Sequence, residues 1–120
     1  MGSILIESDT PTFRRQDVPM ALVIGGSETL LRSVAKAALT AQVLLGECTV
    51  NDALNTAAEM KPLVLILPED VYSADSLAYE ELARDVQAGL LRVNQDNIDL
   101  VHIENELIAL MMTAESVRDL

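Results

Sequence analysis

Gly25, Gly26 and Ser27 form the first group of residues whose types and spacing are suited to chemistry. They follow the apolar run 21–24 (ALVI) and precede an amphipathic stretch, so they lie where a strand turns into a helix. Backbone N–H groups at a helix N-terminus can bind a phosphate. The stretch lacks the lysine of a P-loop and the spacing of a dinucleotide-binding loop. Glu28 would also repel a phosphate, so a tight turn capped by Ser27 competes with the anion-site interpretation.

Pro68, Glu69 and Asp70 form the second group, directly after the apolar run 63–67 (LVLIL). The carboxyl ends of parallel strands meet at one edge of a sheet, so this group is expected beside the glycine turn. Carboxylate oxygens there could hold a cation weakly or simply form a solvated acidic loop. The candidate ligand rim therefore consists of Gly25, Gly26, Ser27, Pro68, Glu69 and Asp70.

Nucleophilic and metal-binding side chains are scarce. Cys48 is the only cysteine and His102 the only histidine, so an internal disulfide is excluded and a reducing compartment is expected. A zinc site or a Cys–His nucleophile would require these two residues to meet. No nucleophile–base pair can be identified in the sequence. We therefore expect no catalytic residues, no metal, no cofactor and no enzymatic activity.

The strands that would position these groups are short apolar runs. They are expected at 21–25, 41–46, 63–67 and 90–93. Gly46 is expected to end the second strand. The run 63–67 has no polar residue, which is typical of a central strand covered by helices on both faces.

Helices are expected between these strands. Ser27 caps the first, residues 76–88 form the third with Gly89 as its left-handed cap, and the last begins near residue 99. Thr49 and Asp52 resemble a capping box for the second. The apolar stripe of that helix consists of Val50, Ala53, Leu54, Ala57 and Ala58. Residues 68–75 (PEDVYSAD) are expected to form a loop.

This alternation predicts an α/β fold with a parallel sheet. We expect a flavodoxin- or receiver-like three-layer sandwich, in which helices flank a short sheet of about four strands. Residues 1–19 form a polar, proline-punctuated lead-in, and residues 20–120 form the domain. Within the lead-in, residues 4–6 (ILI) could add a strand to a sheet edge or remain a loose end.

From residue 20 to about 75, the chain resembles response-regulator receiver domains. The resemblance rests on ALVIGGSETLLRSVAKAAL and on AQVLLGECTVNDALNTAAEMKPLVLILPED. It implies phosphorylation of an aspartate with Mg²⁺ held by an acidic pair. In this sequence, Gly25 and Gly26 stand at the positions of the acidic pair, and Pro68 stands at the position of the aspartate that accepts the phosphate. The hydroxyl residue falls near Asn94, and the lysine of a fifth strand has no counterpart. The chain therefore resembles a pseudo-receiver that has lost the phosphorylation residues.

The last helix carries apolar residues on two sides. One stripe contains Leu100, Ile103, Leu107 and Leu110, and the other contains Val101, Ile108 and Met112. One stripe can cover the sheet, while the second has no evident cover inside a four-stranded domain. We therefore expect a protein–protein contact surface, with a second copy of the chain among the candidate partners. Its residues are Leu100, Val101, Ile103, Leu107, Ile108, Met111 and Met112. Alternatively, the N-terminal segment folds back over this helix.

The net charge of −11 and the pI near 4.2 disfavour contacts with nucleic acid and anionic membranes, which need a basic surface. The N-terminus lacks the pattern of a signal peptide, and no apolar run has the length of a membrane span. We expect a cytoplasmic adaptor or regulator in bacterial-type signalling, such as a two-component system, or in protein positioning. The alternative is a small flavodoxin- or Rossmann-like domain that binds a small ligand or nucleotide at the rim.

Overall fold

The computed structural model describes residues 19–118, with side chains described up to Thr113. The prediction for residues 1–18, including the strand or loose end at 4–6, lies outside these residues. The strands are β2 (Met20–Ile24), β3 (Leu44–Cys48), β4 (Val64–Pro68) and β5 (Gly89–Val93). The helices are α2 (Glu28–Ala41), α3 (Ala53–Met60), α4 (Glu69–Ala74), α5 (Ser76–Val86) and α6 (Leu100–Arg118).

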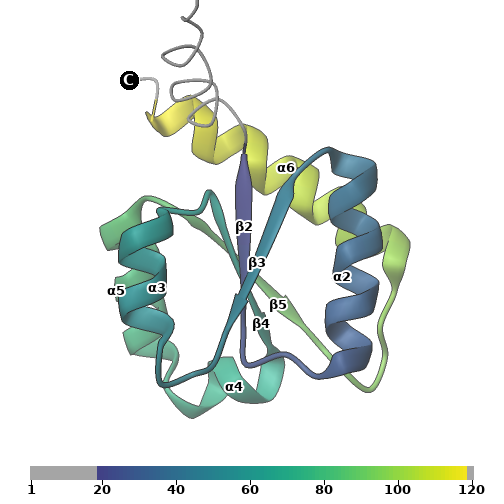
Figure 1. The fold of residues 1–120 in the computed structure, drawn as a ribbon, viewed down its shortest axis with the longest axis horizontal. Helices are drawn as coiled ribbons and strands as arrows, with labels where there is room; N and C mark the ends of the chain where they lie inside the picture. Colours follow the sequence, from purple (N-terminus) through teal and green to yellow (C-terminus); the bar gives the residue numbers. More distant parts are fainter. Residues whose placement is uncertain (1–18, 119–120) are drawn as a thin grey trace, which may run out of the picture.

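The four strands form one parallel sheet in the order β3-β2-β4-β5. Helices cover both faces, with α2 and α3 on opposite sides of the sheet (Figure 1). This is the predicted α/β fold with flavodoxin-like topology. Parallel pairing places the carboxyl ends of all four strands at one edge, where the residues predicted for the rim follow β2 and lie at or after the end of β4.

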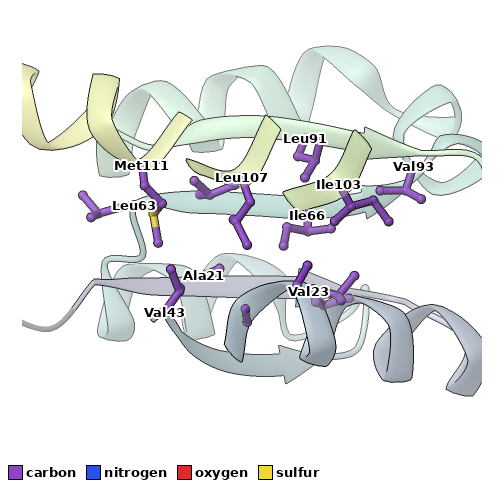
Figure 2. Close-up of a cluster of buried hydrophobic side chains, with 14 of the residues drawn as sticks. Ala21, Val23, Val43, Leu63, Ile66, Leu91, Val93, Ile103, Leu107 and Met111 are labelled. Atoms are coloured by element: carbon purple, nitrogen blue, oxygen red, sulfur yellow. The ribbon is translucent and has the colours of Figure 1, made fainter. Parts of the chain in front are cut away.

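The core on the α2 and α6 face is aliphatic. Alternate residues of β2 and β4 point into it and meet the inner sides of both helices (Figure 2). Helix α6 contributes Ile103, Leu107 and Met111, whose residues are 1%, 0% and 5% exposed. All five residues of β4 are buried, which confirms the prediction of a central strand. Helix α6 therefore belongs to the core of the domain.

The opposite core lies beneath α3 and α5, where it includes the two tyrosines, Tyr72 and Tyr79. The predicted stripe of α3 is only partly confirmed, because Ala53 and Ala57 are its buried members. Val50 precedes α3, and Val50 and Leu54 are 48% and 65% exposed. The buried residues of this eight-residue helix are small alanines, and Met60 at its end packs against the same core while partly buried. The large side chain of Leu54 remains outside.

Gly46 does not end its strand, contrary to the prediction. β3 continues to Cys48, and a Cβ on Gly46 would lie 2.6 Å from Cε of Met60. The missing side chain leaves room for Met60 to pack on the sheet. Gly89 likewise begins β5 instead of capping α5, since Gln87 adopts the left-handed conformation with φ 59°.

The prediction of a loop at 68–75 is also wrong, because residues Glu69–Ala74 form the helix α4. Pro68 precedes its first turn, where a fixed φ is compatible with helix initiation. Glu69 and Asp70 occupy that first turn, and carboxylates there are favoured by the helix dipole. Their charge is typical of a loop, but their position suits a helix start equally well.

Among the described residues, no helix combines the length and the apolar character needed to cross a membrane.

Candidate functional site

The glycine turn at the end of β2 uses its own polar groups. The Oγ of Ser27 accepts a hydrogen bond from the backbone N–H of Leu30 at 3.2 Å, which confirms the predicted cap. The backbone N–H of Ser27 donates to Oε1 of Gln95 at 3.1 Å. Two donors at this helix N-terminus are therefore satisfied within the chain. This local arrangement favours the capped turn over an anion cradle.

Gly25 occupies the position where the receiver resemblance expects a metal-binding acid. Its φ is +68°, and its N–H donates to the carbonyl of Cys48 at 2.9 Å. A Cβ at this position would lie 2.9 Å from Cγ2 of Val50 and 3.4 Å from Cγ2 of Val71. Valine methyl groups therefore cover the place from which an acidic side chain would extend. Methyl groups offer no ligand to Mg²⁺, which binds oxygen.

Pro68 occupies the position expected for the phosphate acceptor. It is buried as the last residue of β4, and it pairs with Val93 of β5. Its ring carries no group that could attack a phosphoryl donor. The nearest carboxylates along the chain, those of Glu69 and Asp70, belong to the first turn of α4.

Glu69 is held by an arginine that the sequence patterns do not single out. Arg92 of β5 donates from Nε and Nη2 to the two carboxylate oxygens of Glu69, each at 3.0 Å. Ser73 Oγ donates to the same carboxylate at 3.3 Å. The hydrogen bonds from Arg92 raise the pKa of its guanidinium. Glu69 thus has a partner for its charge and ties α4 to β5.

The same arginine also lies against an aromatic ring. Its guanidinium carbon is 4.4 Å from the centroid of Tyr72, whose hydroxyl donates to the carboxylate of Glu80. The hydrogen bond to Glu80 is the main cause of the raised pKa of Tyr72. Arg92 and Tyr72 therefore link α4, α5 and β5 through side-chain contacts between the buried Tyr72 and the partly exposed Arg92. This network is a structural brace and presents no unpaired nucleophile.

Asp70 and Ser27, which belong to the two halves of the predicted rim, are connected through Gln95. The Nε2 of Gln95 donates to Oδ1 of Asp70 at 3.5 Å, and its Oε1 accepts from the backbone of Ser27. Gln95 follows β5 by two residues, so the rule that places the other rim residues would also find it. Sequence reasoning misses it because an amide is not counted among the reactive side chains.

Two separate hollows lie at this rim. One of about 390 Å³ is lined by Glu69, Asp70, Asn94, Gln95 and Asp96. The other, of about 570 Å³, lies beside β3 and is lined by Gly25, Gly26, Leu31, Glu47, Cys48, Thr49, Val50, Asp52 and Thr56. Of the residues predicted to form one ligand rim, Gly25 and Gly26 line one hollow and Glu69 and Asp70 line the other. Ser27 and Pro68 line neither of the two.

Cys48 and His102 do not meet. Cys48 packs with the core beneath α3, whereas His102 is exposed on α6, which covers the other face of the sheet. Partial burial is the main cause of the raised pKa of the Cys48 thiol; Asp52 adds to it, and a hydrogen bond with Thr56 opposes it. Within residues 19–118 as described, no three His, Cys, Asp or Glu side chains gather as a metal site.

The predicted contact surface on α6 requires a correction. Ile103, Leu107 and Met111 lie in the core, so they cannot line an outer surface. Leu100 and Leu110 are partly buried against the same core. The outward apolar side chains are those of Val101, Ile108 and Met112, with exposures of 63%, 39% and 65%, and we call these three residues the outer stripe.

Comparison of the chain with protein-family models, with curated proteins and with solved structures found no match.

Proposed function

We propose that the chain is a non-catalytic, pseudo-receiver-like interaction module, an adaptor or regulator that works without phosphorylation. The observation that carries the proposal is the outer stripe. Helix α6 buries one side in the core and leaves Val101, Ile108 and Met112 exposed on the other. Exposed apolar side chains aligned on one helix are a recurring basis of helix-mediated recognition. A protein partner is therefore the ligand that this surface fits best.

The state of the rim supports the absence of phosphotransfer. Acyl-phosphate chemistry needs a carboxylate nucleophile and oxygen ligands for a divalent cation. Pro68 supplies no nucleophile, and the methyl groups of Val50 and Val71 lie over Gly25. Glu69 is engaged by Arg92. Each of these positions is used for packing or for a structural ion pair.

The experiment on phosphotransfer uses a small phosphoryl donor. The full chain is incubated with acetyl phosphate and Mg²⁺, and its intact mass is recorded under conditions that preserve acyl phosphates. We expect the mass to stay unchanged, because Glu69 is paired with Arg92 and the described residues gather no three acidic, histidine or cysteine side chains that could hold Mg²⁺. A gain of one phosphoryl group that disappears in Glu69→Gln or Asp70→Asn would overturn the phosphorylation-independent function.

A second candidate function is ligand binding at the rim, and the hollow beside Gly25 favours it. This hollow has about 570 Å³, a volume within the range of small-molecule sites. Glu47 and Asp52 line it, so a phosphorylated ligand would meet negative charge there. A panel of nucleotides and divalent ions, tested by calorimetry and thermal melting, distinguishes the two functions. Saturable heat or a raised Tm that is lost in Glu47→Trp, which places a bulky side chain at an exposed position of the hollow, would favour the ligand-binding domain.

A further inference from the structure

The outer stripe lies on a helix surface that carries only negative charge. Between Leu100 and Thr113 the sequence contains Glu104 and Glu106 but no lysine or arginine. Two such helices placed face to face would bring like charges together, which is unfavourable. The surface therefore fits an occupant that combines apolar side chains with positive charge better than it fits a second copy.

The N-terminal segment joins the described domain close to this helix. The carbonyl of Pro19 accepts from the backbone N–H of Leu44 at 2.9 Å, so residue 19 lies at the amino edge of the sheet. Ala21, two residues later, shares a core cluster with Met111 of α6 (Figure 2). Pro19, the first described residue, therefore lies near the C-terminal half of α6, where Met112 is exposed.

The composition of this segment matches the surface. It contains Phe13, the only phenylalanine of the chain, followed by Arg14 and Arg15, and an apolar run at residues 4–6. Phe13 is six residues from Pro19, a reach of about 20 Å in an extended chain. The apolar run can reach about 43 Å. The outer stripe is only about 16 Å long from Val101 to Met112.

We propose that residues 4–15 dock on the outer stripe of the same chain. The ring of Phe13 packs on Met112, the apolar run lies towards Val101 and Ile108, and the two arginines face the acidic side of α6. The inference rests on the proposed function, because it assigns an occupant and a mode of regulation to the same surface. A partner protein gains the stripe by displacing this segment, so the segment keeps the surface covered until a partner is present.

The test observes the methionine methyl groups of the full chain by NMR. The aromatic ring of Phe13 shifts the resonance of a methyl group that it contacts, and the chain has five methionines that can be assigned by substitution. Met60 packs against Gly46 on the opposite face of the sheet and serves as the internal control. The variants are Phe13→Leu, which removes the ring but keeps an apolar side chain, and Arg14→Glu with Arg15→Glu, which reverses the charge.

We expect Phe13→Leu to move the Met112 methyl resonance and leave that of Met60 in place. In the charge-reversed variant, the Met112 methyl resonance should shift towards the position that the wild-type resonance has in high salt. Salt weakens the attraction of the arginines to α6, so both changes release the segment. An unchanged Met112 resonance in both variants would overturn the inference. A Met112 resonance that changes with protein concentration would overturn it in favour of a second copy. Either result leaves the proposed interaction function standing, since that function depends on a partner binding the stripe.

Discussion

Gly25 stands at a position where the receiver resemblance expects a metal-binding acid, but no acidic side chain fits there. Its left-handed backbone and the contact with Val50 leave no space for a side chain. We predict that Gly25→Ala lowers the free energy of unfolding by about 1–2 kcal/mol, the usual cost of a left-handed conformation for a non-glycine residue. Urea denaturation measures the change. When Gly25→Ala is combined with Val50→Ala, only the part of the lost unfolding free energy that comes from the contact with Val50 should be recovered. Recovery of the whole loss would contradict an origin in the left-handed backbone.

Cys48 gives the fold a defined response to alkaline pH. Its folded-state pKa lies above the ordinary value of 9.0, mainly because of partial burial. Near and above pH 9 the unfolded chain therefore loses the thiol proton before the folded chain does, and stability falls as pH rises. We predict a smaller decline in stability above pH 9 for Cys48→Ala than for the wild-type chain. Equal slopes in urea titrations at several pH values would contradict this assignment.

The two sides of α6 differ in what they contribute at the scale of the element. Leu107 is fully buried, whereas its neighbour Ile108 is 39% exposed. We predict that Leu107→Ala costs about 2–5 kcal/mol of stability, as for other buried leucines. Ile108→Ala should change stability by less, on the order of 0.5 kcal/mol. Thermal or urea unfolding gives both values, and similar losses would show that the outer stripe is part of the core.

Several elements can be predicted from the sequence because their signals are local. The run 63–67 has no polar residue, and a buried parallel strand is the structure that accommodates it. Ser27 precedes an amphipathic stretch, and its cap forms as expected. Helix α4 cannot be predicted from the sequence, because Pro68 and the two acidic residues after it are typical of loops. The same residues are favourable at a helix start, and tertiary packing of Tyr72 selects that outcome.

The candidate site is predictable as a location but not in its internal contacts. The rim follows from the parallel strands, and the positions of Gly25 and Pro68 follow from the sequence. The pairing of Glu69 with Arg92 joins residues 23 positions apart, and the bridge from Ser27 to Gln95 spans 68 positions. Such contacts depend on how the strands align in the sheet. On α6, periodicity identifies two apolar sides but does not assign Met111 to the inner one.

At the scale of the whole molecule, the carboxyl edge of the strands and the outer stripe of α6 differ in the groups that they present. At the carboxyl edge of the strands, valine methyl groups cover Gly25, and the carboxylate of Glu69 is paired with Arg92. The outer stripe of α6 remains exposed and apolar in a chain of net charge −11. A strongly acidic domain that exposes aligned apolar side chains on a helix is suited to select a partner that is apolar and basic. The proposed function therefore depends on α6 and not on the rim.

The most direct test of the proposed function compares what three full-length chains retain from a lysate of the native cells. The chains are the wild type, Met112→Asp, and Leu77→Asp as the matched control. Leu77 is 68% exposed on α5, and Met112 is 65% exposed on α6, so both variants place a charge at an equally open position. Retained proteins are quantified by mass spectrometry, and circular dichroism verifies that the variants are folded.

We predict a protein that the wild type and Leu77→Asp retain in equal amounts and that Met112→Asp loses. If all three folded chains retained the same proteins in the same amounts, the outer stripe would not be the working surface, and the proposed interaction function of α6 would be contradicted.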